Sequence, residues 1–408
     1  MPKIAFIVQR YGSEVVGGAE ALTREIAQAL VKNASWSVEV YTSTALDYQT
    51  WSQHFQEGRE VVFGVGVQRF NSSRRRSIFF SPYNALLNFI LIPLIKLLPE
   101  LFGNKLRDFL EYFWIQLQGP VCPLLIKKLI KDLNEYDHIV FVTYLYYPTI
   151  WGIRSLDRLG FKNYSLIAAA HDEPAFHFNI IRKILEKVPI ILSLHPEEAR
   201  LISSKLASSS KIRHIGMGFD DKNFNSQEAV PQNFEKEVFY FGRLSRGKNT
   251  HLLIDWMQKY FPSIKVKFAG RQDSDLNIPK TRQFIFLGYL NEGDKVAELF
   301  KAFVIVNPSI HESLSMIVIE AIAAGKPVLV NGASSVLRYY SDALSTVFCF
   351  EGEESFKEQL DFILKQDWYT ESWQKELKKS KNWVLENFGW QRMYFEFRRL
   401  VEPVDKNS

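Results

Sequence analysis

Short apolar runs alternate with amphipathic segments along the whole chain of 408 residues. Near the N-terminus the run PKIAFIV is followed by QRYGSEVVGGAEALTREIAQAL, in which apolar positions recur every three or four residues. This pattern predicts a buried strand and then a helix. Further strands are predicted at VFYF, KVKFAG, FIFLG, AFVIV, PVLV and STVFCF, with helical segments between them. Strands that alternate with helices indicate an α/β fold with doubly wound parallel sheets.

The length and composition predict two domains. With 47% hydrophobic residues, the chain can bury two separate cores. The stretch GMGFDDKNF at residues 216–224 has the composition of an interdomain loop. We therefore expect a first domain at residues 1–218 and a second at 219–384, followed by a C-terminal segment at 385–408.

The run NPSIHESLSMIVIEAIAAGKPVLVN, residues 307–331, carries the first candidate chemistry. A strand ends there and a helix begins, with Ser313 or Ser315 as its N-cap and Gly325 after its end. The first turn of such a helix presents backbone N–H groups at the carboxyl end of a parallel strand, where anions such as phosphate bind. Glu312 lies just before this helix and Glu320 lies two turns into it. Both can accept hydrogen bonds from ligand hydroxyls, for example from a sugar and a ribose.

A second motif, VFYFGRLSRGKNTHLLIDWM, agrees with this interpretation. It predicts a strand, a tight turn at Gly242, a basic loop and an amphipathic helix. Arg243 and Lys248 would lie beside the diphosphate of a nucleotide sugar. Because negative charge builds on that group as the glycosidic bond breaks, fixed cations stabilise the transition state more than the ground state. No D-x-D sequence lies at an obvious strand end in this half, so we expect no metal.

The two motifs resemble the E-x7-E and G-R-L-x-x-x-K segments of retaining glycosyltransferases of family 4, also called group 1. The resemblance covers nearly the whole chain and implies the GT-B fold, in which two Rossmann-like domains face a central cleft and a C-terminal helix returns to the first domain. It also implies a nucleotide-diphosphate sugar as co-substrate, without any cofactor. In this family the second Glu, here Glu320, holds the nucleotide ribose.

Other segments gain roles from the same resemblance. The glycine loop at Gly17 and Gly18 is similar to the loop that lies close to the diphosphate. The strand in SLIAAAHDEPAFH ends at His171, which corresponds to a histidine that faces the donor sugar in this family. Because these enzymes retain the anomeric configuration of the sugar, a general base at Asp172 is not expected. We therefore assign Asp172 to contact with the acceptor or the sugar. The resemblance thus assigns catalysis to His171, Arg243, Lys248 and Glu312, donor binding to Gly17, Gly18, Gly242, Tyr289, Leu290, Ser313, Leu314, Ser315 and Glu320, and the acceptor or sugar contact to Asp172.

Residues 71–119 form the segment least similar to the family, and acceptor specificity usually resides in such segments. A basic cluster, Arg74 to Arg76, precedes a strongly apolar stretch. Prolines and charges interrupt this stretch, so no uninterrupted run of about 20 residues remains for a transmembrane helix. Two interpretations stay open: docking to the membrane interface, or burial as helices of the first domain. For docking we expect apolar surface from Phe79, Phe80, Leu86, Phe89, Ile90 and Trp114.

Net charge and cysteines set further limits. The net charge of +5 comes from 50 basic and 45 acidic residues and does not indicate nucleic-acid binding. Cys122 and Cys349 lie far apart and show no disulfide or zinc spacing. The apolar run at the N-terminus is too short for a signal peptide, so we expect a cytoplasmic protein, with peripheral attachment to the inner face of the membrane if residues 71–119 dock there.

The sequence therefore favours a retaining glycosyltransferase that moves a sugar to a glycan or lipid-linked acceptor in cell-envelope polysaccharide or lipopolysaccharide biosynthesis. Three alternatives stay open: a nucleotide-sugar epimerase of the same fold, a non-catalytic envelope-assembly protein, and a peripheral membrane scaffold. The donor sugar, the nucleotide base and the acceptor cannot be derived from the sequence.

Overall fold

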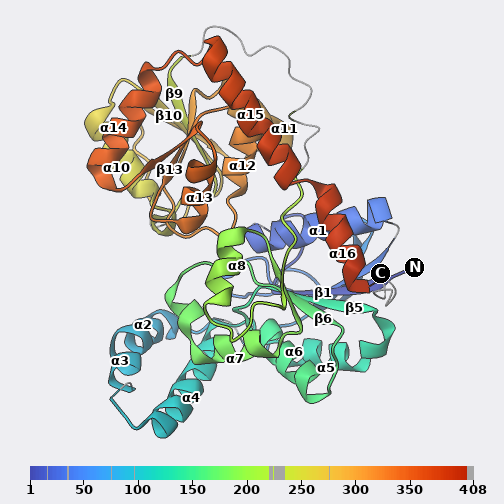
Figure 1. The fold of residues 1–408 in the computed structure, drawn as a ribbon. Helices are drawn as coiled ribbons and strands as arrows, with labels where there is room; N and C mark the ends of the chain where they lie inside the picture. Colours follow the sequence, from blue (N-terminus) through green and yellow to red (C-terminus); the bar gives the residue numbers. More distant parts are fainter. Residues whose placement is uncertain are drawn as a thin grey trace. The chain divides into compact units, whose positions relative to one another are not determined.

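A computed structural model describes residues 1–401 apart from Val16, Ser35, Arg75, Lys96, 220–223, 225–234 and Asp275. The chain divides into two compact units. Unit 1 comprises Met1–Ile215 and the C-terminal segment from Arg392, and unit 2 comprises Gly216–Gln391. Each unit is a sheet with helices on both faces (Figure 1), as the α/β prediction requires. Arg75 of the basic cluster and most of the second half of the predicted interdomain loop lie outside the described residues.

Unit 1 contains an eight-stranded sheet whose strand order reverses beside its first strand. The order is β3 (Gly58–Val62), β4 (Val65–Phe70), β2 (Ser37–Ser43), β1 (Lys3–Val8), β5 (His138–Val142), β6 (Tyr164–Ile167), β7 (Ile190–Ser193) and β8 (Ile212–His214). Neighbours are parallel except in the β3–β4 hairpin. Because β1 pairs with both β2 and β5, the carboxyl ends of β1 and β5 form a topological switch point, where ligands bind in open α/β sheets.

Helices bury both faces of this sheet. The helices α1 (Gly18–Ala34) and α16 (Trp390–Val401) cover one face, and α5 (Pro123–Lys131), α6 (Tyr147–Arg158) and α7 (Asn179–Lys187) cover the other (Figure 1). On β1, Ala5 and Ile7 join the core cluster below α6. Phe6 points to the opposite face, where its ring centroid lies 6.2 Å from that of Phe397 on α16. Burial on both faces explains why β1 is apolar from Ile4 to Val8.

The segment between β4 and α5 forms a helical hairpin that projects from unit 1 (Figure 1). It consists of α2 (Phe80–Leu86), the π-helical η1 (Leu87–Leu91), α3 (Ile92–Ile95) and α4 (Glu100–Gln118). Phe80 and Trp114 are buried, with ring centroids 5.1 Å apart, so the expectation that these two add to an apolar surface is wrong. They anchor the hairpin in the unit 1 core instead.

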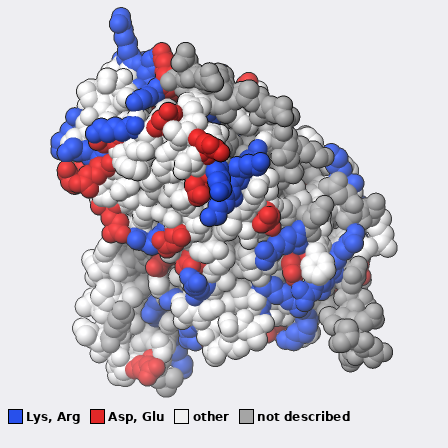
Figure 2. Space-filling model, turned by 45° about the horizontal axis from the view of Figure 1, so that its top comes forward, with Lys and Arg blue, Asp and Glu red and all other residues white. Residues whose placement is uncertain are grey.

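The hairpin nevertheless exposes many apolar side chains. The exposed ones are Ile78, Phe79, Leu86, Phe89, Ile90, Leu94, Leu97, Leu98, Phe102, Phe109 and Phe113. In Figure 2 the lower left of the molecule, where the hairpin lies, is largely white, whereas basic and acidic side chains are interspersed elsewhere on that face. Among the described residues, no helix combines the length and the apolar composition needed to cross a bilayer.

Unit 2 contains six parallel strands, one at each of the six predicted apolar runs. The order is β11 (Phe284–Gly288), β10 (Lys265–Ala269), β9 (Glu237–Phe241), β12 (Val304–Asn307), β13 (Val328–Asn331) and β14 (Val347–Phe350). The helices α10 (Thr250–Tyr260) and α14 (Gly352–Lys365) share a core with one face, while α11 (Glu292–Lys301), α12 (Met316–Ala323) and α15 (Glu371–Asn387) cover the other (Figure 1). The order reverses between β9 and β12, so unit 2 has its own switch point.

Candidate functional site

The switch point of unit 2 brings Lys248 and Glu312 together. Lys248 ends the short helix η4 (Arg246–Lys248) after β9, and Glu312 lies in the loop after β12. The Lys248 Nζ donates to Glu312 Oε1 over 2.9 Å and to the His311 carbonyl over 2.9 Å. These residues are 64 positions apart in sequence. They meet because β9 and β12 are neighbouring parallel strands of the sheet.

Asparagine side chains hold the loop after β12 in place. Asn307, the last residue of β12, donates to the Ser315 Oγ over 2.8 Å. Asn249, the N-cap of α10, and Asn331, the last residue of β13, both donate to the Pro308 carbonyl, over 3.2 and 3.0 Å. The loop is therefore tied to β12, to the start of α10 and to the end of β13, which fixes the backbone around Glu312.

The start of α12 confirms one of the two predicted N-cap positions but lacks the side-chain capping bond. Ser315 is the N-cap residue, so Ser313 is not, and the Ser315 side chain makes no capping hydrogen bond. Its φ of 64° is left-handed, a conformation that favours glycine, and its hydroxyl accepts from Asn307 instead. Leu314 is buried, and its carbonyl accepts from the Tyr340 hydroxyl over 2.8 Å. The first turn of α12 is thus not capped by the serine hydroxyl that the sequence suggested.

Arg243 is held by a carboxylate that sequence reasoning missed. Asp273, from the loop after β10, accepts from Arg243 Nε over 3.1 Å and from Nη2 over 2.6 Å. Gly242 has a φ of 145°, so the predicted tight turn after β9 does require glycine there. A Cβ on Gly270 would lie only 1.9 Å from the Gly242 carbonyl, which shows how closely the two loops approach. This close approach places Asp273 against the guanidinium.

Glu320 forms a buried ion pair with Lys295 of α11. The Lys295 Nζ lies 2.8 Å from Glu320 Oε2, and the two side chains are 7% and 9% exposed. The same Nζ lies 2.8 Å from Glu292 and 5.4 Å from the centroid of the Phe241 ring. Burial raises the pKa of Glu320, although Lys295 acts in the opposite direction. Burial lowers the pKa of Lys295, but its two carboxylate neighbours outweigh this effect and leave it raised.

Tyr289 and Leu290 follow β11 at the outer edge of the same sheet. Tyr289 is 72% exposed. Because β11 is separated from β9 by β10, these residues lie at the carboxyl edge but two strands from the Lys248–Glu312 pair.

In unit 1 the switch point is built around a buried ion pair, Arg10–Glu20. Arg10 follows β1 and donates from Nε to Glu20 Oε1 over 2.9 Å, and Gln9 donates to the same oxygen over 2.9 Å. A Cβ on Gly17 would lie 2.1 Å from Glu20 Oε2, whereas one on Gly18 would meet no atom within 4 Å. Gly17 therefore makes room for a buried carboxylate, a role that the sequence did not reveal.

His171 and Asp172 diverge after β6. The His171 Nε2 lies 3.4 Å from Glu173 Oε2, and Glu173 also accepts a hydrogen bond from the buried Tyr144 hydroxyl. Asp172 instead contacts His177 Nε2 over 2.5 Å, away from this network. The structure thus brings His171 together with Glu173 and Tyr144, but not with Asp172.

A second carboxylate, Glu198, lies beneath His171. It is 1% exposed and accepts backbone hydrogen bonds from Ala170 over 2.8 Å and from Leu194 over 2.7 Å. Burial raises the pKa of Glu198 to about 7, while the backbone donors and His171 oppose the shift. Through the hydrogen bond from Ala170, Glu198 fixes the backbone directly before His171.

Sequence comparison with known proteins gives two matches, each over less than half of this chain. Residues 221–380 match the family described as Glycosyl transferases group 1. Over 188 residues the chain is 28% identical to an uncharacterized glycosyltransferase of Methanocaldococcus jannaschii, a match that covers 43% of this chain and only 47% of that relative. The match to the group 1 family thus spans the unit that contains the Lys248–Glu312 pair.

Solved structures define the fold of the whole chain. Sucrose-phosphate synthase from Thermosynechococcus elongatus is similar with a TM-score of 0.68 and 17% identity over 98% of both chains. Anabaena HepE, solved with UDP-glucose, is similar with a TM-score of 0.65 and 16% identity over 98% of this chain and 99% of that one. Identities this low establish the fold alone. The fold is GT-B, with two Rossmann-like units, as the sequence predicted.

Proposed function

We propose that this protein is a retaining family 4 glycosyltransferase that transfers a sugar, such as a hexose, from a nucleotide-diphosphate donor to a hydroxyl of a glycan or lipid-linked acceptor. The pairing of Lys248 with Glu312 at the switch point of unit 2 is the observation that carries the proposal. The match of residues 221–380 to group 1 glycosyl transferases and the UDP-glucose held by the similar HepE structure also support it.

Each group has a role that follows from its chemistry. Lys248 and Arg243 offset the negative charge that develops on the leaving diphosphate, without a metal. Glu312 accepts hydrogen bonds from the donor sugar, and Glu320 accepts them from the ribose. His171 contacts the transferred sugar. When the diphosphate binds, its oxygens replace the Glu312 carboxylate as partners of the Lys248 ammonium, because the carboxylate and the phosphate are both anions that can pair with this cation.

The acceptor side rests on unit 1. We assign to the hairpin at residues 80–118 the recognition of a lipid-linked or polysaccharide acceptor, and to the protein a cytoplasmic location at the inner face of the cell membrane. The exposed apolar side chains of the hairpin support this assignment. The proposed pathway is the biosynthesis of cell-envelope polysaccharide or lipopolysaccharide.

Nucleotide release tests the proposal. The protein is incubated with UDP-, GDP-, dTDP- and ADP-sugars, with and without membrane extract, and free nucleotide is measured. We expect release from one donor that depends on the extract and falls by about a hundredfold in Lys248→Ala, as for loss of one charge-stabilising donor. Lys259→Ala is the matched control, because Lys259 is an exposed lysine of the same unit that lies in the last turn of α10 and pairs with Glu353 of α14. Equal rates in wild type and Lys248→Ala would refute the site, and release without extract would favour an epimerase or a hydrolase.

A further inference from the structure

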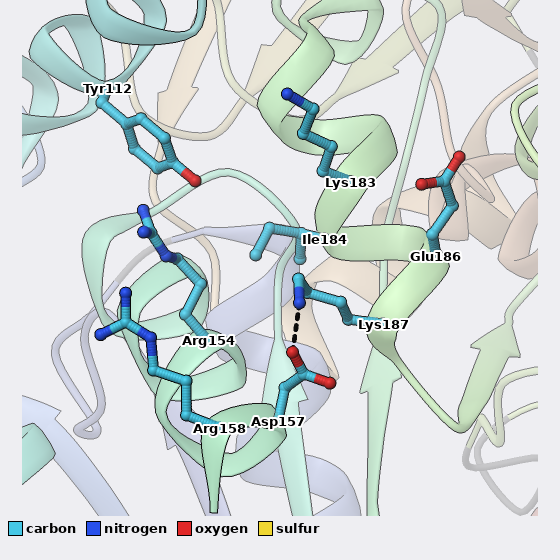
Figure 3. A pocket seen from close by; sticks show the side chains of 8 residues that line it. All are labelled: Tyr112, Arg154, Asp157, Arg158, Lys183, Ile184, Glu186 and Lys187. Atoms are coloured by element: carbon cyan, nitrogen blue, oxygen red, sulfur yellow. Dashed lines mark hydrogen bonds and ion pairs between the residues drawn. The ribbon is translucent and has the colours of Figure 1, made fainter.

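A basic pocket lies on the side of unit 1, between α6 and α7 and bordered by Tyr112 of α4 (Figure 3). Its accessible volume is about 370 Å³. Arg154 and Arg158 line it from α6, and Lys183 and Lys187 line it from α7. Arg154, Arg158 and Lys187 belong to the second halves of their helices and Lys183 is the middle residue of α7, whereas α6 begins at the carboxyl edge of the sheet. The pocket is therefore separate from the switch-point residues described above.

The two arginines are the cations of this pocket that remain available for an anion. Lys187 pairs with Asp157 inside the pocket (Figure 3), and Lys183 pairs with Asp108 of α4. Within the described part of the chain, neither Arg154 nor Arg158 forms an ion pair with a carboxylate.

The geometry of the two guanidinium groups suits a phosphate. Arg154 and Arg158 are four residues apart on one helix, so their side chains lie on the same face. The Arg154 guanidinium lies 4.4 Å from the centroid of the Tyr112 ring, which keeps it extended along the pocket wall. A planar guanidinium donates two parallel hydrogen bonds to a phosphate, and two of them can bind one group together.

Exposed apolar side chains continue from the pocket along α4. Phe109 and Phe113, within one turn of Tyr112, are 68% and 45% exposed. Further along the hairpin, Phe89 and Leu97 are each 81% exposed. A free phosphate would leave these side chains in water, whereas a lipid bilayer offers phosphate groups directly above an apolar interior.

We propose that the pocket binds the phosphate of an anionic lipid headgroup, while α4 and the end of the hairpin enter the apolar part of the same bilayer. Residues 71–119 contain six Lys or Arg and three Asp or Glu, a net charge of +3 that favours an anionic membrane surface. The inference extends the proposed function, because it holds the protein where a lipid-linked acceptor would lie, but lipid binding does not require transfer activity.

Vesicle co-sedimentation of the full-length protein tests this site. The double variant Arg154→Gln/Arg158→Gln removes the two available cations. Each basic residue near an anionic surface contributes about fivefold to partitioning, so binding to phosphatidylglycerol-containing vesicles should fall about thirtyfold. The matched control is Lys127→Gln/Lys131→Gln, which removes two exposed charges with the same spacing from α5 of the same unit, and it should reduce binding by less than threefold. The double variant Arg154→Lys/Arg158→Lys keeps both positive charges but removes the guanidinium groups, so it separates the effect of charge from that of guanidinium geometry.

A second variant pair tests the apolar half of the proposal. Phe89→Ser/Leu97→Ser alters two side chains that are largely exposed, so the fold should be retained. It should weaken binding to anionic and to neutral phosphatidylcholine vesicles alike, whereas the arginine variant should affect only the anionic ones. Circular dichroism and thermal unfolding verify that all variants fold.

Three results would overturn the inference. If Arg154→Gln/Arg158→Gln bound anionic vesicles as strongly as the wild-type protein does, the pocket would be excluded as the lipid-binding site. An equal loss in the Lys127/Lys131 control would mean diffuse electrostatic attraction only. Saturable binding of inorganic phosphate to the pocket, measured calorimetrically, without vesicle binding would assign the site to a free phosphate compound. The proposed function assigns nucleotide binding to unit 2, and this binding can be measured without membrane extract. Failure of the proposed function would appear as unchanged nucleotide binding in Lys248→Ala, whereas failure of the present inference would appear only in the vesicle assay.

Discussion

The buried pair Lys295–Glu320 offers a test that separates stability from ligand binding. In the variant Glu320→Leu, Lys295 keeps only Glu292, a carboxylate whose side chain is 60% exposed. At a separation of 2.8 Å and an effective dielectric constant of about 20, the lost attraction is roughly 6 kcal/mol before solvation is counted. Removal of one partner from such buried pairs costs about 3–5 kcal/mol, because the other charge stays desolvated. We expect that loss for Glu320→Leu.

The double variant Lys295→Met/Glu320→Leu should recover most of the stability. It replaces the two charges by apolar side chains of similar size, and such replacements are often neutral or stabilising. Urea denaturation combined with hydrogen exchange of α11 and α12 measures the effect within unit 2 alone. Donor affinity gives the second measurement: a lost hydrogen bond between Glu320 and the ribose should weaken nucleotide binding about tenfold or more, even in the stable double variant.

Two outcomes would refute this reasoning. A double variant as unstable as Glu320→Leu would show that the loss arises from packing rather than from an uncompensated lysine. A double variant with unchanged nucleotide affinity would remove Glu320 from the donor site, whatever its stability.

Three further predictions concern pH and glycine. Burial lowers the pKa of His138 to about 4 from 6.5, so unfolding should become easier as the pH falls from about 6.5 towards 4, and His138→Asn should flatten this dependence in urea titrations. Burial lowers the pKa of Lys326 to about 8 from 10.5, so the unfolded chain binds more protons between these values. Stability should therefore rise with pH in that window, and Lys326→Met should remove the rise and increase the thermal midpoint at pH 7. Gly17→Ala should cost about 2 kcal/mol or more, because its Cβ would displace the Glu20 carboxylate, whereas Gly18→Ala should be close to neutral in the same thermal melts.

The elements of unit 2 could be predicted because their signals are local. Each strand is a short apolar run, and the residues that end it, such as Asn307 and Gly242, are turn formers within the same few positions. The placement of Lys248 and Glu312 at the same edge of the sheet follows from a general property, since parallel strands end at one edge, but their direct pairing depends on the strand order, which was not predicted. The N-cap position at Ser315 was predicted correctly, but its hydroxyl caps no backbone N–H group, and it accepts a hydrogen bond from the Asn307 side chain instead.

The partners of the charged residues could not be predicted. Asp273, which holds Arg243, and Lys295, which holds Glu320, come from other elements, and the sequence around each residue does not indicate its partner. Their positions depend on how loops and helices pack above the sheet. The same limit applies to the hairpin, where composition does not reveal that Trp114 is buried while nearby Phe113 is exposed.

The pairing of Lys248 with Glu312 has a consequence for selectivity between ligands. If the pair binds the donor as proposed, an anion that replaces Glu312 at the Lys248 ammonium also frees this carboxylate to accept a hydrogen bond from a hydroxyl. The two recognition events are thus thermodynamically coupled, and each makes the other more favourable. Inorganic phosphate or a neutral sugar gains only one of the two contacts, so a molecule that joins both groups binds more strongly than the separate fragments suggest.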